Sequence, residues 1–341
     1  MQYHIINSSK FGGAELIAAR LSKKLSDNCL IIIFKNNHLF TERLKIDSKN
    51  LFFLLRNIFS NNENSFFSHN IQAHIILNIL HILKRTILKT DSSKYYNVIH
   101  FDAFHIKKFW LNFYINLLKI YRPKLIFVSE YSKNQFFKKI SFFINSQVIN
   151  NSISDDFFEK KHSGRSLKKL NTNELKIGFI GRYSPVKQLP LFLEICLELK
   201  KITKKDYKFY IQSDISRREI NKLLEKIIKR NNYQFNYLDI VLYKSQQNPK
   251  IFYRSIDILI STSKTETFGL TCIEALAMGK RIYTINSKSI ELLFGKVNFN
   301  LKAKRTRDIA KLLINSFDKK YILPDISKFK DCAMIKEYSK L

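Results

Sequence analysis

The chain of 341 residues has few cysteines, glycines and prolines and no long apolar run, and each of these shortages excludes a class of protein. Four scattered cysteines without a Cys-x-x-Cys pair exclude a disulfide framework and a cysteine-based zinc site, so we expect a reducing, cytoplasmic compartment. Eight glycines and five prolines are too few for collagen-like or linker-rich architectures. No apolar run reaches the roughly 18 residues that cross a bilayer, and we expect neither a membrane-spanning helix nor a signal peptide.

Acidic residues are also scarce, because 28 Asp and Glu face 59 Lys and Arg and leave a net charge of +31. Such a charge, with an aromatic content of 13%, leaves a basic nucleic-acid-binding protein as one alternative. The charge is spread evenly, however, with +15 on residues 1–170 and +16 on residues 171–341. An even spread indicates a compositional habit rather than one recognition surface, so we expect no nucleic-acid partner.

Short apolar runs alternate with longer amphipathic stretches, which is typical of a parallel sheet with crossover helices. The expected strands are Tyr3–Ile6, Leu30–Phe34, Val98–His100, Leu125–Val128, Gln147–Ile149, Lys176–Ile180, Phe209–Ile211, Ile240–Leu242, Ile256–Ile260 and Arg281–Thr284. The expected helices are Ala14–Leu25, Ile71–Leu88, Lys108–Ile120, Lys133–Ile140 and one that begins near Pro190.

A polar, charge-rich segment divides this pattern into two halves. We predict an N-terminal Rossmann-like domain over residues 1–160, a linker over 161–174 and a second Rossmann-like domain over 175–325. Residues 326–341 are expected to form a C-terminal helix that returns to the first domain. The fold class is therefore α/β.

The most informative stretch is Glu266-Thr-Phe-Gly-Leu-Thr-Cys-Ile-Glu274, which follows one apolar run and enters another. That order reads strand, loop and helix, with Glu266 in the loop and Glu274 inside the helix. Ligands of open α/β sheets bind at this edge. Carboxylates accept charge-assisted hydrogen bonds from hydroxyls, and a helix N-terminus at Gly269 and Leu270 favours phosphate. Two unrelated surface glutamates are the plainer alternative.

The same spacing resembles the E-x7-E signature of the retaining family 4 glycosyltransferases, the glycosyl transferases group 1. The resemblance implies a GT-B fold, in which two Rossmann-like domains face each other across a cleft. It further implies that Glu266 contacts the donor sugar, that Glu274 holds the nucleotide ribose, and that Gly269 and Leu270 lie at the donor diphosphate.

A second motif, Gly178-Phe-Ile-Gly-Arg182-Tyr-Ser-Pro-Val-Lys187, follows the first strand of the second half. The guanidinium of Arg182 can fork onto phosphate oxygens, and Lys187 supplies a compact charge. By resemblance to the family this is the diphosphate clamp, which neutralises the leaving nucleoside diphosphate. We therefore expect no metal and no other cofactor.

The first half carries weaker matches. Gly12 and Gly13 follow the first strand, where the family places a Gly-Gly-Ala-Glu-like loop near the donor diphosphate. His100 and Asp102 are the catalytic candidates at another strand end, because the family has a His-x-His pair there and Asp102 replaces its second histidine. His105 is a further candidate; a structural role is the alternative for each histidine.

Several positions depart from the family pattern and mark a divergent member. Gln188 stands where a glycine follows the clamp lysine, and Gln212-Ser-Asp214 replaces a Gly-x-Gly near the nucleotide. Arg281 replaces a common proline, whereas Glu291 matches a late family glutamate and is a further site candidate. These departures leave an inactive glycosyltransferase-like scaffold as an alternative.

The resemblance implies a glycosyltransferase of the hexosyltransferase type that moves a sugar, with retention, from a nucleotide sugar. A UDP-sugar is the favoured donor and a saccharide or lipid-linked saccharide the expected acceptor, in bacterial surface polysaccharide or lipopolysaccharide assembly. The enzyme is then cytoplasmic and peripheral on the inner face of the cell membrane.

Two segments are candidates for contact with anionic lipids. One is the apolar stretch Ile71–Leu88, for which a buried core helix is the alternative. The other lies between Ile106 and Ile140, where Glu130 is the only acidic residue. Its basic residues are Lys107, Lys108, Lys119, Arg122, Lys124, Lys133, Lys138 and Lys139.

Overall fold

A computed structural model describes most of the chain, as two compact units. The described residues are 1–8, 12–24, 28–35, 48–60, 62–88, 92–104, 106–158, 166–167, 170, 174–203, 205–233, 238–245, 247–295 and 299–341. Unit 1 comprises Met1–Ser152 and Asp331–Leu341, and unit 2 comprises Ile153–Lys330. The units therefore meet in the sequence after Ser152 and after Lys330. Much of the expected linker, 161–174, lies outside the described residues.

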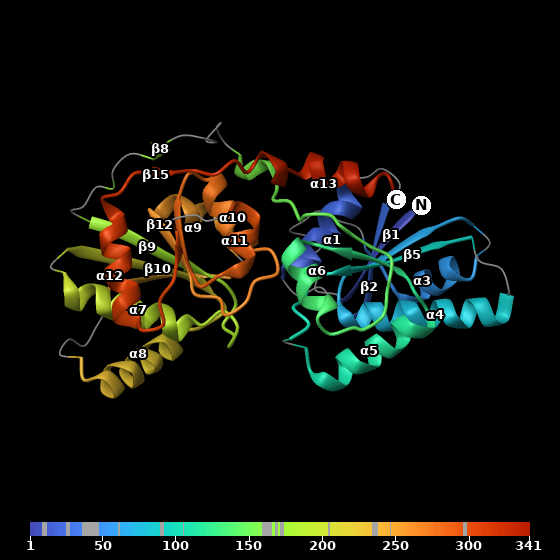
Figure 1. The fold of residues 1–341 in the computed structure, drawn as a ribbon, viewed down its shortest axis with the longest axis horizontal. Coiled ribbons are helices and arrows are strands. Elements are labelled where there is room, and N and C mark those ends of the chain that lie inside the picture. Colours follow the sequence, from blue (N-terminus) through green and yellow to red (C-terminus); the bar gives the residue numbers. More distant parts are fainter. Residues whose placement is uncertain are drawn as a thin grey trace. The chain divides into compact units, whose positions relative to one another are not determined.

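Unit 1 contains a parallel sheet in the order β3-β2-β1-β4-β5-β6-β7 across its described strands (Figure 1). The strands are β1 (Gln2–Ser8), β2 (Asn28–Lys35), β3 (Ser48–Lys49), β4 (Ser65–Ser68), β5 (Lys94–Ile99), β6 (Lys124–Phe127) and β7 (Ser146–Val148). From β1 the chain adds β2 and β3 on one side of the sheet, and it then adds β4 to β7 on the other side. The strand order therefore reverses between β1 and β4. Parallel strands need crossover connections, and the helices between them supply these.

The helices of unit 1 are amphipathic and cover the sheet (Figure 1). They are α1 (Gly13–Lys24), α3 (Leu51–Ile58), α4 (Ile71–Leu88), α5 (Lys108–Ile120), α6 (Glu130–Phe137) and α13 (Asp331–Tyr338). Alternate β1 residues face opposite sides: Tyr3 packs in one core cluster with α3 and α4, whereas Ile6 packs in another with α1. The two faces of the sheet therefore have separate apolar cores.

The C-terminal helix α13 is held on unit 1 by a buried carboxylate. Asp331 Oδ1 accepts a hydrogen bond of 2.5 Å from Ser152 Oγ and forms an ion pair of 3.2 Å with Arg20 Nη1. Arg20 Nη2 also donates to the carbonyl of Ser152 at 2.6 Å. These hydrogen bonds and the ion pair give the buried carboxylate and guanidinium polar partners, which offsets the cost of burying their charges. Asp331–Leu341 thus belongs to unit 1.

Unit 2 has its own parallel sheet, ordered β11-β10-β9-β12-β13-β14 among the described strands. These are β9 (Glu174–Ile180), β10 (Asp206–Ser213), β11 (Ile240–Lys244), β12 (Ile258–Ser261), β13 (Arg281–Ile285) and β14 (Asn300–Leu301). The described segments β8 (Ser166–Leu167) and β15 (Tyr321–Ile322) pair antiparallel in a separate ribbon. In the main sheet the order reverses between β9 and β12.

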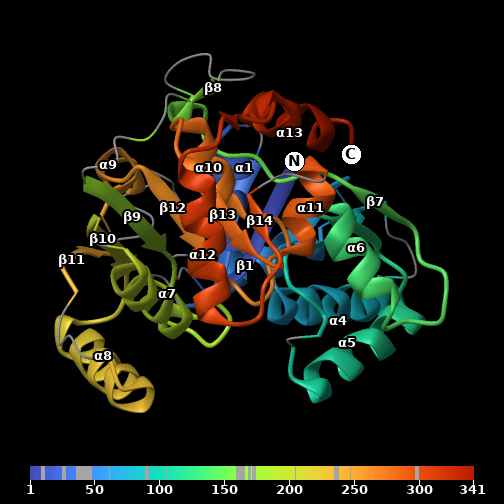
Figure 2. The same ribbon diagram turned by 60° about the vertical axis from the view of Figure 1, so that its left-hand side comes forward.

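Several helices of unit 2 begin at residues that favour a helix N-terminus. Of these helices, α7 packs beside α12 (Figure 2). They are α7 (Leu189–Ile202), α8 (Arg217–Asn231), α9 (Pro249–Ser255), α10 (Leu270–Ala277), α11 (Lys288–Phe294) and α12 (Thr306–Phe317). Ser216 and Glu219 form a capping box at α8, and Pro190 lies in the first turn of α7. The 3-10 helices η1 (Asp155–Phe157) and η2 (Ser327–Phe329) complete the unit.

The predicted α/β class is confirmed, and the strand and helix predictions locate most elements within a few residues. The strands and α-helices that were not predicted are β3, β4, β8, β14, β15, α3, α8, α9, α11 and α12. The four residues of β4 lie between Asn64 and His69, so their surroundings look like a turn. Among the described residues, no helix is both long and apolar enough to cross a membrane.

Candidate active site

The site in unit 2 lies where the strand order reverses between β9 and β12. In open α/β sheets, ligands bind outside the carboxyl ends of the strands at such a point. The segment after β9 carries Arg182 and Lys187, and the segment after β12 carries Glu266. Register places Ile258 of β12 beside Ile177 of β9, so the two segments leave neighbouring strand ends. Two motifs nearly eighty residues apart in sequence therefore meet.

Lys187 and Glu266 form the central contact of this site. Lys187 Nζ lies 2.5 Å from Glu266 Oε1, and the side chains are only 23% and 14% exposed. A pair this shielded from water interacts more strongly than one on the open surface, where such pairs contribute about 0–1 kcal/mol. The contact keeps an ammonium and a carboxylate together at the strand ends.

Backbone and hydroxyl hydrogen bonds join the two segments that carry this pair. Thr262 Oγ1 donates to the carbonyl of Lys187 at 2.9 Å, and the amide of Lys264 donates to the carbonyl of Val186 at 2.8 Å. Gly181 packs against Lys187, since a Cβ added there would lie 3.3 Å from Lys187 Cγ. The main chain therefore holds Lys187 in place before any ligand arrives, which reduces the ordering cost of binding.

Arg182 lies at the start of the same segment and is exposed. It makes no ion pair or hydrogen bond with the part of the chain that the structure describes. The next residue is fixed, because the amide of Tyr183 donates to Asp214 Oδ1 at 2.5 Å. Asp214, at a departure from the family pattern, thus takes up a backbone donor that a glycine has no side chain to accept.

Glu274 is buried inside α10, with 8% of its surface exposed. Tyr253 Oη donates to Glu274 Oε2 at 2.8 Å, which orients the carboxylate. Burial, together with the nearby Glu274 charge, raises the pKa of Tyr253 well above its ordinary value, so its hydroxyl remains a donor. The helix that carries Glu274 starts after Gly269.

Gly269 precedes Leu270 with φ +88°, a left-handed conformation. This backbone conformation favours glycine, and a Cβ here would lie 2.9 Å from Ile290 Cδ1, so the end of the Ile290 side chain would have to shift. Leu270 is the first residue of α10, whose first amides have no partner within the helix. The segment after β12 thus ends on a helix N-terminus, the predicted position for a diphosphate.

Gln188 also adopts the left-handed conformation, with φ 51° and ψ 49°. It precedes α7, and its carbonyl accepts from the amides of Leu191 and Phe192. The position therefore keeps the backbone that a glycine favours although the side chain differs. For a non-glycine residue this conformation costs roughly 1–2 kcal/mol.

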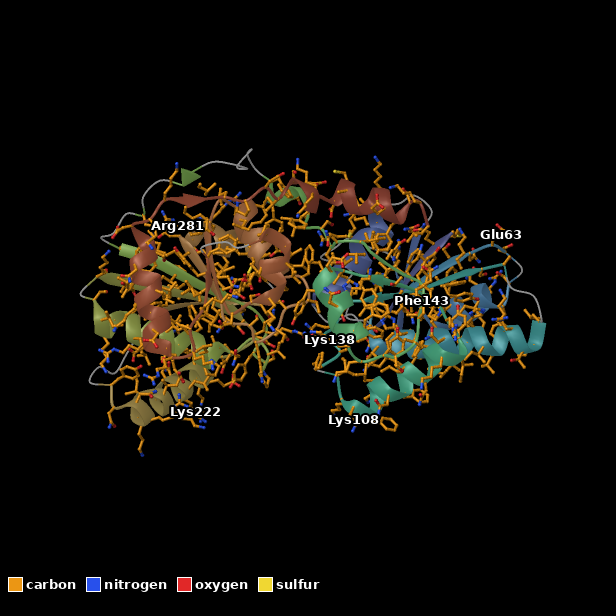
Figure 3. The ribbon with its side chains drawn as sticks, viewed as in Figure 1. Glu63, Lys108, Lys138, Phe143, Lys222 and Arg281 are labelled. Carbon is orange, nitrogen blue, oxygen red and sulfur yellow. The ribbon has the colours of Figure 1, made fainter. Side chains whose placement is uncertain are left out.

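The late glutamate Glu291 makes a surface contact. Its Oε2 pairs with Lys302 Nζ at 2.7 Å, with the Glu291 side chain 33% exposed and that of Lys302 55% exposed. This ion pair is separate from the one between Lys187 and Glu266. Arg281, another departure, is buried on β13 and donates from Nη1 to the carbonyl of Phe317 at 3.0 Å, so it stabilises the unit (Figure 3).

Unit 1 has a comparable edge, where the order reverses between β1 and β4. Gly13 begins α1, and the carbonyl of Gly12 accepts from the amide of Leu16 at 3.0 Å, so both predicted glycines lie at a helix start after β1. Lys10 and Phe11 of the same motif lie outside the described residues.

The other candidates of unit 1, His100 and Asp102, have different partners in the structure. His100 follows β5 and contacts the ring of His69, with 3.0 Å between His100 Nε2 and His69 Nδ1. Asp102 is buried, and its Oδ1 accepts from the amide of Phe104 at 2.9 Å in a turn. A turn-forming role thus accounts for Asp102. His105 lies outside the described residues.

Three residues that touch these candidates were not predicted: His69, Tyr253 and Thr262. His4, which contacts His69, was not predicted either. A histidine within an apolar strand, as at His4, is a signal that sequence reading can use, because a buried imidazole needs partners. Within the described parts of the chain, no group of three or more His, Cys, Asp and Glu residues is arranged to hold a metal ion.

The sequence and the fold of this chain are similar to those of glycosyltransferases. Residues 163–319 match the family model described as Glycosyl transferases group 1. A curated Klebsiella pneumoniae protein, described as an uncharacterized 41.2 kDa protein in the cps region, is 28% identical over 149 residues. That match spans 42% of this chain and only 37% of the curated relative's length.

Solved structures share the whole fold at low identity. HepE from Anabaena, in complex with UDP and glucose, superposes with a TM-score of 0.78 at 15% identity, covering 99% of this chain and 98% of HepE. The lipopolysaccharide outer core galactosyltransferase WaaB superposes with a TM-score of 0.68 at 14% identity, over the full length of both chains. These likenesses confirm the predicted GT-B fold.

Proposed function

We propose that this divergent member of the group 1 glycosyltransferases transfers a sugar, with retention, from a UDP-sugar to a saccharide or lipid-linked saccharide. The family match supports transfer of a glycosyl group. The choice of UDP is supported by HepE, which was crystallised with UDP and with UDP-glucose. The cps-region relative and WaaB support a role in bacterial surface polysaccharide or lipopolysaccharide assembly.

The observation that carries this proposal is the Lys187–Glu266 pair at the strand-order reversal of unit 2. A nucleotide sugar presents a diphosphate and sugar hydroxyls side by side. Lys187 and the exposed Arg182 supply the positive charge that the diphosphate needs, and Glu266 supplies an acceptor for a sugar hydroxyl. Glu274, oriented by Tyr253, accepts from the ribose. The amides after Gly269 complete the phosphate contacts.

In the reaction, the bond between the anomeric carbon and the UDP oxygen breaks, and UDP leaves with the electron pair. The acceptor oxygen forms its bond to the anomeric carbon on the same face, and its proton passes to the departing phosphate oxygen. Negative charge grows on the diphosphate as this bond breaks. Lys187 and Arg182 therefore stabilise the transition state more than the bound donor, which is the requirement for catalysis.

The experiment is a donor screen with UDP-hexoses without added metal, followed by NMR of the anomeric proton in the product. The expected result is turnover of a UDP-sugar with the anomeric configuration of the donor kept. An inverted product would refute retention. No turnover, together with no binding of any nucleoside diphosphate, would instead support the inactive-scaffold alternative.

Unit 1 carries a surface that favours peripheral association with an anionic membrane. The outer side of α5 has an exposed apolar stripe at helical spacing, formed by Phe109, Phe113 and Ile120, which are 71%, 40% and 73% exposed. Trp110 and Phe143 are exposed as well. An exposed apolar stripe of this kind on α5 supports an interaction site.

Basic side chains accompany this stripe. Lys107, Lys108, Lys119, Lys138 and Lys139 are exposed, and Figure 3 marks Lys108 and Lys138 on this part of the chain. Lys139 Nζ lies 3.9 Å from the ring centre of the exposed Phe104. We call these lysines together with Phe104, Phe109, Trp110, Phe113, Ile120 and Phe143 the basic-aromatic surface. Aromatic rings that insert at lipid headgroups and lysines that contact anionic phosphates suit the inner membrane face.

The other lipid candidate, α4, is chiefly a core helix. Its residues Ile71, Ile75 and Leu77 are buried, whereas Ile79 and Leu83 are 37% and 46% exposed. The core alternative therefore accounts for most of this helix.

Vesicle co-sedimentation tests the membrane proposal. Wild-type protein should bind vesicles that contain phosphatidylglycerol, and it should dissociate as salt increases. Replacing Phe109 and Phe113 with Ser should reduce binding, whereas the control Phe52→Ser, on the exposed side of α3, should not. Equal binding to neutral vesicles, or equal loss in the control, would contradict docking through this surface.

A further inference from the structure

Three histidines on or just after three neighbouring strands form a continuous chain of ring contacts in unit 1. His4 Nδ1 lies 3.0 Å from His69 Nε2, and His69 Nδ1 lies 3.0 Å from His100 Nε2. His4 belongs to β1, His69 follows β4, and His100 follows β5. The rings are tilted by 41° and 31° with centres more than 5 Å apart, so their edges meet through nitrogen atoms.

Sheet register explains how residues so distant in sequence align. His4 pairs with Phe67 across β1 and β4, and His69 lies two residues beyond Phe67 on the same face. Ser68 pairs with Asn97 across β4 and β5, so the position opposite His69 is Val98. His100 lies two residues beyond Val98, on the same face. Each histidine is thus shifted toward the carboxyl ends of the strands, and the chain of rings ends at the edge where His100 was predicted to act.

The first member of the chain has a fixed direction. Asn28 Nδ2 lies 3.3 Å from the carbonyl of Leu21 and 3.1 Å from His4 Nε2. A carbonyl oxygen only accepts, so the atom beside it is the amide nitrogen of Asn28. That nitrogen donates to His4 Nε2 as well, which therefore carries no proton.

Each ring then determines the next. Burial lowers the pKa of His4 and of His100 to about 3 and the pKa of His69 well below its ordinary value, so all three are neutral near pH 7. A neutral imidazole has one N–H. The proton of His4 lies on Nδ1 and is donated to His69 Nε2, and the proton of His69 lies on Nδ1 and is donated to His100 Nε2. The remaining position for the proton of His100 is Nδ1.

We infer that Asn28, His4 and His69 are positioning residues that hold His100 as the Nδ1–H tautomer, a neutral hydrogen-bond donor for an oxygen of the reacting sugars. The inference rests on the proposed glycosyl transfer for its catalytic part. A neutral donor of fixed direction stabilises an oxygen without adding a charge at that edge of the sheet. The relay also explains why the buried His4 occupies a strand position that an apolar residue would fill at lower cost.

The relay is tested first without any activity measurement. Long-range ¹H–¹⁵N correlation spectra of the ring nitrogens in the full-length wild-type protein should show His4, His69 and His100 as neutral Nδ1–H tautomers at pH 7. An Nε2–H tautomer or an imidazolium at any of the three would overturn the relay. This measurement needs no variant, so it holds even where a buried substitution impairs folding.

A variant then tests whether His69 controls His100. His69→Phe keeps ring shape and removes both contacts, so His100 should gain the Nε2–H tautomer that its neighbour no longer excludes. Persistence of Nδ1–H at His100 would overturn control by His69. His81→Phe is the matched control, because His81 is also a buried imidazole of unit 1 but stacks on Tyr95 outside the relay, and it should leave His100 unchanged.

Kinetics separate the catalytic role from a structural one. Removing an outer partner that orients a metal-binding imidazole typically costs about 10–100-fold, and we expect a kcat loss of that order in His69→Phe. The KM for the donor and the affinity for UDP should stay within about twofold, since neither His69 nor His100 is among the residues proposed to contact UDP. Unchanged kcat would overturn the role of the relay in catalysis. Correct tautomers with no turnover of any donor by wild-type protein would refute the proposed function, and with it that role.

Discussion

Lys187 Nζ lies 2.5 Å from Glu266 Oε1, so the cation of one motif and the carboxylate of another meet where the strand order of unit 2 reverses. The two residues belong to segments after β9 and β12, and hydrogen bonds from Thr262 and Lys264 hold these segments together. A diphosphate and a sugar hydroxyl need opposite partners at a short separation. This pair supplies them before the donor binds.

The two members of the pair should differ in what they do. Lys187→Ala should weaken UDP binding, because hydrogen bonds to charged groups contribute about 1.5–3 kcal/mol, or about tenfold or more in Kd. Glu266→Gln should leave UDP affinity within about twofold and lower kcat by about 100-fold, since it contacts the sugar. Calorimetry and initial rates measure the two effects. Near-normal turnover in either variant would contradict the assignment.

Tyr253 should contribute to nucleotide binding although it is buried. Tyr253→Phe removes the hydroxyl that donates to Glu274 Oε2 at 2.8 Å and leaves the ring in the core. The carboxylate then loses its orientation, and we expect UDP affinity to fall by about fivefold, consistent with about 1 kcal/mol for one hydrogen bond. The comparison of UDP with inorganic pyrophosphate distinguishes ribose from phosphate contacts. An equal loss for UDP and pyrophosphate would contradict a ribose contact at Glu274.

Gln188 should tolerate replacement by glycine and reject a branched residue. Its backbone is left-handed, which glycine adopts without strain, so Gln188→Gly removes strain but adds entropy to the unfolded chain. The expected change in unfolding free energy lies between zero and about +1 kcal/mol. Gln188→Val should destabilise by more than about 1 kcal/mol. Urea denaturation measures both; equal effects of the two substitutions would show that the conformation imposes no strain.

Acid should destabilise unit 1 through its buried histidines. The folded pKa values of His4 and His100 are about 3, below the ordinary value of 6.5, so between these values the unfolded chain binds more protons. Stability is therefore complete above about pH 6.5 and is lost as pH falls toward 3. At pH 5 each of these histidines costs about 2 kcal/mol relative to pH 7. Denaturation midpoints that stay level from pH 7 to pH 5 would contradict this burial.

Much of unit 2 was predictable because its motifs are local. The alternation of apolar runs located β9 and β12, and the segments after them carried Arg182, Lys187 and Glu266. Parallel strands bring their carboxyl ends to one edge, so proximity followed from topology. The orientation of Glu274 by Tyr253 did not follow, since it depends on how α9 packs beside α10 rather than on spacing.

The histidine relay was not predictable for a related reason. It needs β4 between β1 and β5, and β4 has only four residues with serine at both ends. Without that strand, His69 has no assigned neighbour. Gln188 shows a different limit, because a side chain departed from the family pattern while the backbone kept its conformation.

Calorimetric titration of UDP into wild-type protein and Lys187→Ala, at moderate salt without metal, tests the phosphate contact at Lys187 most directly. We expect saturable binding to the wild type, with a Kd in the micromolar range, and affinity lower by about tenfold or more in the variant. Equal UDP affinity in both proteins would contradict a phosphate contact at Lys187. Absence of UDP binding to the wild type would contradict the proposed UDP-sugar donor.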